Sequence, residues 1–388
     1  MITRDEIREL AEFQSAQCNA VTFYYQPTTP SDKSHREEAL RIKDLVKDAV
    51  READKNGKGC KLLKADLDRL LAWAEGLHGN QGRAKAVFAC ASTRLWKEFD
   101  LPAQLPGTAL HVNTRFHLRP LSALQDALCS TYVALVERNK ARLFHMQEGE
   151  IQEREDFVAL LPRRGRSDGF LGYDAGHAER RVENEALGHF KRVADRLLEL
   201  QQKGSCDRLI FGCREDVWPE IERQLHPYLR GCLAGRFDID IATATAEQVR
   251  ERARGMLSAF RDKQRRNLVR EVLDEARSRN HGAVGLRRVL RSMEQAEVQT
   301  LLIESSFAAP GVHCSNCGHI DMHLVKECTV CGCETREVED ISDALVGLAL
   351  RNGVEVVYVP NDPDLQKAGN IAARLRFRAE RGAERIAS

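Results

Sequence analysis

Cys314-Ser315-Asn316-Cys317-Gly318 and Cys328-Thr329-Val330-Cys331-Gly332 are two copies of one pattern, Cys-x-x-Cys-Gly, in a single short segment. Each copy can direct two thiolates toward one point, because the glycine after the second cysteine permits a tight turn. Together they supply the four soft ligands that tetrahedral zinc prefers. We therefore expect a structural zinc ion with no open coordination position, bound by Cys314, Cys317, Cys328 and Cys331.

The remaining eight cysteines are scattered along the chain: Cys18, Cys60, Cys90, Cys129, Cys206, Cys213, Cys232 and Cys333. Several lie in apolar runs, where a free cysteine behaves as a small hydrophobic residue. This distribution indicates buried thiols in a reducing compartment rather than a disulfide framework. Cys333 directly follows the second Cys-x-x-Cys-Gly copy (we call each copy a knuckle). We do not expect it to bind metal, because the set of four ligands is already complete.

The bulk composition allows two or three domains in 388 residues. Lys plus Arg (59) nearly equals Asp plus Glu (58), so any contact with nucleic acid requires local basic patches. No apolar run approaches the roughly 20 residues that span a bilayer. The first seven residues are charged and amphipathic, unlike a secretion signal. We expect a cytoplasmic protein with no membrane contact.

Residues 1–126 are predicted to form an α+β domain. We expect helices at 4–15 and 34–53, a further helix that carries Leu63 to Ala74, and strands at 20–25, 85–91 and 94–99. A turn is predicted between the second and third helices, at Lys55-Asn56-Gly57-Lys58-Gly59, where the helical pattern stops. The outside of this helical hairpin is basic, which is also typical of a solvated face.

Residues 127–243 are predicted to form a sheet-and-helix domain. A hairpin at 132–136 and 141–146 leads into a basic, glycine-rich loop at 162–176, followed by a helix at 176–203 and a strand at 208–212. Residues 244–388 are predicted to form an α/β domain with the zinc ribbon inserted at 310–337. Its expected helices are 246–279, 283–294 and 340–352, and its expected strands are 300–303 and 354–359.

The third domain resembles the C-terminal domain of the archaeal and eukaryotic class 1 peptide chain release factors and of Pelota. Gly285–Leu290 followed by Ala296–Ile303 is similar to the helix and the "A-V-x-x-L-L-I" strand of that superfamily. Leu348–Val356 resembles its last helix-to-strand step, and Gly369–Phe377 resembles its closing "G-G-I-A-A-x-L-R-Y" segment. The resemblance implies the multidomain α+β and α/β architecture of those factors, with three domains. Archaeal members often carry a zinc ribbon at this place.

The first two domains depart from the pattern of the superfamily. Arg163-Arg164-Gly165-Arg166 begins like the loop that carries the Gly-Gly-Gln tripeptide, but no glutamine lies between Gln152 and Gln201. The first domain lacks the Asn-Ile-Lys-Ser motif that reads stop codons. In place of the tripeptide stands Gly172-Tyr173-Asp174-Ala175-Gly176-His177. His177 is a weak candidate for a general base, and packing or RNA contact is the simpler interpretation; we assign no catalytic residue.

The resemblance implies a tRNA-shaped monomer that enters the ribosomal A site without reading a codon, for rescue of stalled ribosomes or hibernation of idle ones. Its implied partners are the ribosome, with its rRNA and tRNA, and a translational GTPase. The residues predicted to contact RNA phosphates are Lys55, Lys58, Arg163, Arg164, Arg166, Arg180 and Arg181. Two alternatives stay open: a peptidyl-tRNA ester hydrolase that uses residues 169–181, and another RNA-binding or nuclease-like protein, although the clustered carboxylates of a two-metal site are missing.

Overall fold

The structure is a computed structural model. It describes residues 2–15, 20–27, 35–55, 61–77, 83–102, 105, 107–124, 129–147, 149–158, 173–314 and 316–378. The chain forms two compact units, of which unit 1 comprises residues 1–125 and 265–388 and unit 2 comprises residues 126–264. Both units are mixed α/β, as expected. The division into three domains stays a prediction. Among the described residues, no helix is long and apolar enough to cross a membrane.

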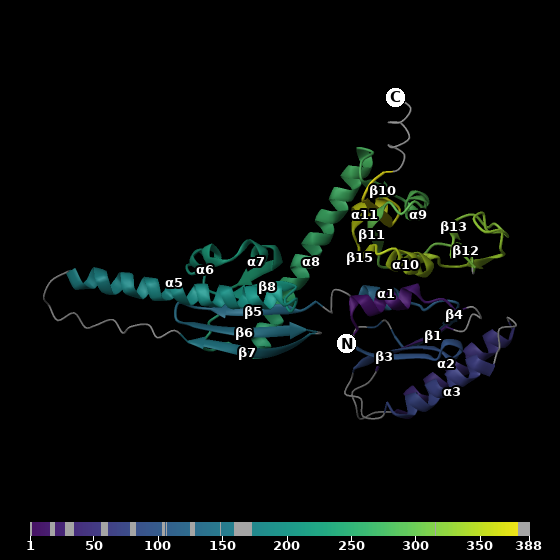
Figure 1. Ribbon diagram of the computed structural model, residues 1–388, viewed down its shortest axis with the longest axis horizontal. Helices are drawn as coiled ribbons and strands as arrows, with labels where there is room; N and C mark the ends of the chain where they lie inside the picture. The colour runs from purple at the N-terminus through teal and green to yellow at the C-terminus, as the bar shows by residue number, and fades with distance from the viewer. Residues whose placement is uncertain are drawn as a thin grey trace. The chain divides into compact units, whose positions relative to one another are not determined.

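The N-terminal part of unit 1 is a four-stranded antiparallel sheet in the order β3-β2-β1-β4. Its strands are β1 (Ala20–Tyr25), β2 (Ala84–Cys90), β3 (Leu95–Leu101) and β4 (Ala109–Asn113). Helices α2 (His35–Lys55) and α3 (Lys61–Glu75) cover one face (Figure 1). Leu63, Leu67 and Leu70 of α3 pack there against Phe23 and Val87. The strands and helices predicted for this region are confirmed.

The other face of this sheet carries the short helices α1 (Arg4–Glu12) and α4 (Arg119–Ala123) and a cluster of rings. A capping box fixes the start of α1, because Thr3 Oγ1 accepts from Glu6 N while the Glu6 carboxylate accepts from Thr3 N. The ring of Tyr24 lies edge-on to Phe88, and its hydroxyl donates to His117 O at 2.6 Å. That bond holds the chain between β4 and α4 against the sheet.

The C-terminal part of unit 1 is a second sheet, in the order β10-β16-β11-β15. Its strands are β10 (Gly282–Val284), β16 (Ile371–Leu375), β11 (Val298–Glu304) and β15 (Glu355–Val359). Helices α9 (Leu286–Glu294), α10 (Ser342–Arg351) and α11 (Pro363–Lys367) connect them. β11 pairs in parallel with β15 and antiparallel with β16. The last turns of α8 (Ala246–Arg277) contribute Val269 and Val272 to its core.

The helix predicted for residues 283–294 is wrong in its first residues. Gly282–Val284 form β10 and pair with Ala372–Arg374 of β16. Gly285 then turns the chain at φ 80°, a left-handed conformation that suits glycine, and the helix begins at Leu286. The apolar residues at 283 and 284 match either a strand or a first helical turn, so the pattern alone did not separate them.

One arginine joins the two sheets of unit 1. The Arg119 guanidinium, at the start of α4, donates to Asp340 Oδ2 at 3.0 Å and to Ser342 Oγ at 2.6 Å. It also donates to the carbonyl oxygens of Ser305 and Phe307, at 3.3 and 3.1 Å. Ser122 and Tyr358 share a hydrogen bond of 2.7 Å beside it. We call these contacts the Arg119 clamp.

Unit 2 is a five-stranded sheet in the order β7-β6-β5-β8-β9. β5 (Thr131–Val136), β6 (Lys140–Gln147) and β7 (Glu150–Val158) form an antiparallel meander, while β8 (Arg208–Gly212) and β9 (Leu233–Phe237) extend it in parallel. The hairpin, the strand at 208–212 and the helix α5 (Tyr173–Gln202) were predicted and are confirmed. The short helices α6 (Trp218–Gln224) and α7 (Pro227–Cys232) were not predicted.

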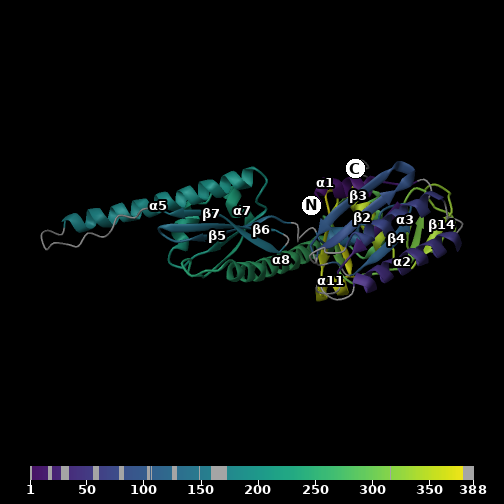
Figure 2. The ribbon, with the colours of Figure 1, turned by 90° about the horizontal axis from the view of Figure 1, so that it is seen from below.

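The side chains of β5 point alternately to the two faces of the sheet, so the core of unit 2 has one part on each face. Ala134 and Val136 face α5, where they pack with Ala186, Phe190 and Leu197. Val133 and Leu135 face the first turns of α8, on the opposite side of the sheet (Figure 2). A strand that is buried on both faces gives the continuous apolar run seen in the sequence. The loop predicted at 162–176 lies mostly outside the described residues, which resume at Tyr173.

Replacing Arg119 by alanine is expected to lower the free energy of unfolding of unit 1 by about 2–3 kcal/mol. The change removes hydrogen bonds to a charged group and leaves the Asp340 carboxylate without its cation. Urea unfolding in a Trp218→Phe background measures this, because Trp73 and Trp96, the remaining tryptophans, both lie in unit 1. Arg277→Ala is the control: its ion pair with Asp274 is exposed, so a loss below about 0.5 kcal/mol is expected. Equal losses in the two variants would contradict the clamp.

Gly282→Ala is expected to destabilise unit 1 by about 2 kcal/mol or more, because a Cβ there would lie 2.4 Å from Ala276 N and Val272 O of α8. These backbone atoms cannot move without distorting the helix. Gly255→Ala, in the same helix, meets no atom within 4 Å and should instead stabilise by about 0.5–1 kcal/mol. Thermal unfolding of the two variants and of the wild type shows whether each substitution raises or lowers the stability. The packing of α8 on β10 would be refuted by a neutral Gly282→Ala.

Candidate metal centre

The two Cys-x-x-Cys-Gly knuckles project from a small three-stranded antiparallel sheet in unit 1. Its strands are β12 (Gly311–Cys314), β13 (Ile320–Asp321) and β14 (Thr335–Val338), in the order β13-β12-β14. Gly311 permits the crossing of the strands, since a Cβ there would lie 2.6 Å from Asp321 O. Cys314 ends β12, and the second knuckle lies in the connection between β13 and β14.

The knuckles have the same backbone hydrogen bonds. Gly318 N donates to Cys314 O, and Gly332 N donates to Cys328 O, each at 2.9 Å. Both glycines have positive φ, 79° and 70°. Cys314 N also donates to His319 O at 2.9 Å, and Cys328 N to Cys333 O at 2.8 Å. The repeated sequence therefore produces a repeated turn, and each turn brings its two thiols together, as predicted.

The four Sγ atoms form one cluster, in which all of them lie within 4.8 Å of one another. Cys314 Sγ lies 3.5 Å from Cys331 Sγ, and Cys317 Sγ lies 3.5 Å from Cys328 Sγ. A tetrahedron with metal–sulfur bonds of ~2.3 Å has sulfur atoms about 3.8 Å apart. A disulfide would require about 2.05 Å. The donor set therefore fits one tetrahedrally coordinated metal ion and leaves no position for a substrate.

The thiols of the cluster differ in acidity. Hydrogen bonds with the Cys333 backbone and then with the Asn316 side chain lower the pKa of Cys331 to about 6. Burial, and then the neighbouring thiols, raise the pKa of Cys317 to about 12. A bound divalent cation would change this balance, since metal binding displaces protons from its thiol ligands.

The other described cysteines do not join this cluster. Cys333 is exposed, and its backbone carbonyl accepts from Cys328 N, so its place next to the knuckle serves the turn. Cys90, Cys206 and Cys213 are buried elsewhere in the fold, and burial raises the pKa of Cys206 to about 12. Cys18 and Cys60 lie outside the described residues.

The residues predicted to contact RNA are mostly outside the described part of the chain. This holds for Lys58, Arg163, Arg164 and Arg166. Lys55 ends α2, and His177 and Arg181 belong to the first turns of α5, but the structure describes only their backbone. Arg180 is exposed on α5. Their roles in RNA contact stay predictions.

A pocket of about 400 Å³ in unit 1 was not predicted from the sequence. It is lined by the chain from β4 to α4, by β12 and β14 of the ribbon, and by α10. His111 and His117 stack in it with ring centroids 3.9 Å apart, and His117 Nδ1 lies 3.0 Å from Asp343 Oδ2. Burial, then the neighbouring His117, lowers the pKa of His111 to about 4. No local motif links these residues, because they come from segments that are distant in the sequence.

The sheets and the core of unit 2 define a mixed α/β protein of several modules, in which four clustered cysteine thiols could hold a metal ion. Residues 117–258 match the model of the Bacterial archaeo-eukaryotic release factor family 10. The curated peptide chain release factor subunit 1 of Archaeoglobus fulgidus is 24% identical over 302 residues, which cover 72% of this chain and 74% of that protein. Over these residues the chain is therefore similar to the archaeo-eukaryotic release factors.

Two solved structures are also similar to this chain. The crystal structure of the archaeal translation termination factor aRF1 has 18% sequence identity and a TM-score of 0.25, with 97% of this chain and 99% of that chain covered. Pelota of Archaeoglobus fulgidus has 13% identity and a TM-score of 0.35, with 97% and 92% covered.

The purified protein is expected to contain about one tightly bound metal ion per chain. Replacing Cys314 and Cys331 together by serine should abolish it, because two thiolates do not hold the ion against a chelator. Elemental analysis after dialysis against a chelator measures the content. The Cys333→Ser variant is the control and should keep the full amount. A metal content that survives the double substitution would contradict the assignment of the ligands.

Proposed function

We propose that this protein is a ribosome-associated translation factor that binds the A site independently of codon, in rescue of stalled ribosomes or in hibernation. The observation that carries the proposal is the family match over residues 117–258, which includes all of the core of unit 2 from β5 to the first turns of α8. The arginines at 163, 164 and 166 fall inside this match, in the segment of the sequence between β7 and α5.

The proposed contact with RNA is electrostatic. Guanidinium groups bind phosphates through two parallel hydrogen bonds, and contacts to the backbone do not depend on sequence. Arg180, Lys191 and Arg192 are exposed along α5 and can extend the basic track beyond the loop. A chain with a formal net charge of +1 needs such a local concentration of positive charge to bind rRNA.

The absence of a Gly-Gly-Gln tripeptide supports binding without peptide release. Between Gln152 and Gln201 the sequence contains no glutamine, so the loop has no neutral amide to position a water against an ester. We propose that the metal ion is zinc, because four thiolates in a tetrahedron suit it, and that the ribbon is a rigid platform in the C-terminal part of unit 1. A delivering GTPase remains a prediction from the resemblance.

Co-sedimentation with ribosomes at stepped salt concentrations tests the proposal. Wild-type protein should bind, and replacing Arg163, Arg164 and Arg166 together by alanine should weaken binding at low salt. The slope of log affinity against log salt should fall by ~0.7 for each phosphate that the variant no longer neutralises. The matched control replaces Arg214, Arg223 and Arg230, which are exposed elsewhere in unit 2 and remove the same charge. Wild-type protein that never sediments with ribosomes would refute the function, and equal slopes in both variants would refute the role of the loop.

The same complexes decide between binding and hydrolysis. Ribosomes that carry labelled peptidyl-tRNA should bind the protein and release no peptide, with or without the His177→Ala substitution. Peptide release that is lost in the His177→Ala variant would contradict the proposed binding function and would favour a peptidyl-tRNA hydrolase instead.

A further inference from the structure

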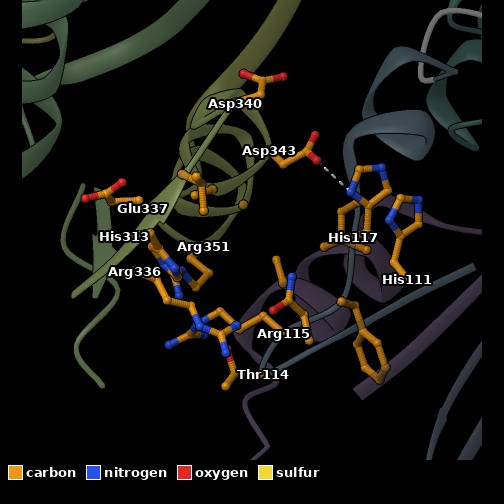
Figure 3. Close-up of a pocket in the computed structure, with 17 residues that line it drawn as sticks. His111, Thr114, Arg115, His117, His313, Arg336, Glu337, Asp340, Asp343 and Arg351 are labelled. Atoms are coloured by element: carbon orange, nitrogen blue, oxygen red, sulfur yellow. Dashed lines mark ion pairs between the residues drawn. The ribbon is translucent and has the colours of Figure 1, made fainter. Parts of the chain in front are cut away.

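The pocket of unit 1 has two unlike walls (Figure 3). On one wall the acidic side chains already have partners within the protein. Asp343 lies 3.0 Å from His117, and Asp340 lies 3.0 Å from Arg119 of the clamp. Hydrogen bonding and charge attraction from His117 keep the pKa of Asp343 below its ordinary value despite burial of the carboxyl. This wall has little remaining charge to offer a ligand.

The other wall is cationic. Arg115 follows β4, Arg336 of β14 lies opposite His313 of β12, and Arg351 ends α10. Burial, and then the charge of Arg115, lowers the pKa of His313 to about 4, so the positive charge of this wall comes from the arginines. Figure 3 shows these four side chains converging from the two parts of unit 1. Among the described residues, no carboxylate lies within ion-pair distance of Arg115, Arg336 or Arg351. This also holds for Glu337, although its exposed side chain lines the same pocket. We call Arg115, Arg336 and Arg351 the arginine triad.

Arg115 and Arg351 are close enough to repel one another. Burial, and then the charge of Arg351, lower the pKa of Arg115 to about 10. Arg115 donates to Phe13 O and to Gln14 Oε1, which are neutral acceptors and leave its charge uncompensated. Such a cluster of partly buried like charges is unfavourable unless an anion offsets it.

The shape and the rest of the lining fit a small organic anion. A volume of about 400 Å³ lies at the lower end of the range for ligand pockets and exceeds what a bare phosphate needs. Phe116, Leu118 and Val338 supply apolar surface beside the charges. Guanidinium forks match the tetrahedral oxygens of phosphate, and a phosphate monoester carries about two negative charges at neutral pH.

We propose that this pocket binds the phosphate group of a small phosphate monoester, held by Arg115, Arg336 and Arg351, with its organic part against Phe116, Leu118 and Val338. Because the residues come from both parts of unit 1, a bound ester would also bridge those parts. The site is separate from the residues proposed to contact the ribosome, so the isolated protein is sufficient to test it.

Calorimetric titration of the full-length, metal-loaded protein tests the site with four probes: inorganic phosphate, adenosine 5′-monophosphate, adenosine, and the dinucleotide ApA without a terminal phosphate. Phosphate and the monophosphate should bind saturably, with the monophosphate tighter, and adenosine and ApA should not bind. Arg336→Gln and Arg351→Gln should each weaken binding of the monophosphate at least tenfold. Arg277→Gln, which removes an exposed arginine of unit 1 that is paired with Asp274, should bind like the wild type.

Three results would overturn the proposal: no saturable binding of phosphate or the monophosphate, equal binding by the triad variants, or binding of ApA alone, which would indicate an RNA backbone. Arg351 lies against Gly318 of the first knuckle, with Nη2 at 3.4 Å from the position of a Cβ, so metal content is measured for every variant. If Arg351→Gln loses the metal, Arg336→Gln decides, because Arg336 is exposed on β14. Loss of binding only in variants that lose the metal would count against the site.

Discussion

The Arg119 clamp is the interaction on which the arrangement of unit 1 depends. A guanidinium offers donors in a rigid fork, and here the fork reaches one carboxylate, one hydroxyl and two carbonyl oxygens. The carbonyl oxygens of Ser305 and Phe307 follow directly after β11, where the chain leaves the sheet toward the ribbon. Arg119 therefore joins the first part of unit 1 to the point at which the chain leaves β11 toward the two cysteine knuckles.

This arrangement concentrates charge in a small space. Asp340 and Asp343, at the start of α10, pair with Arg119 and His117. Arg351, at the end of the same helix, lines the pocket with Arg115 and Arg336. A positive side chain at a helix C-terminus is favourable in itself, but its crowding with Arg115 and Arg336 is not. The pocket beside the clamp therefore has one wall of arginines, and it lies next to the four clustered cysteines that could hold a metal ion.

The features predicted correctly from the sequence are those that depend on residues close together in the chain. The clustering of Cys314, Cys317, Cys328 and Cys331 was predicted, because two cysteines and a glycine within five residues determine each turn; zinc binding stays a prediction. The long helices and buried strands followed from their periodicity. The pocket was not predicted, since Arg115 and Arg351 meet only through the fold. Short elements such as α4, α6 and β10 were missed because a few residues give too little periodicity, and the strand at 282–284 was taken for a helix.

Native-state hydrogen exchange tests most directly whether the two sheets of unit 1 form one cooperative body. Helix α1 has only nine residues and would be marginal alone, so its protection must come from packing in unit 1, including its contact with α10. The account predicts that amides of α1 and α10 open with free energies within about 1 kcal/mol of each other. Amides of α1 that exchange far faster, while those of α10 stay protected, would contradict it.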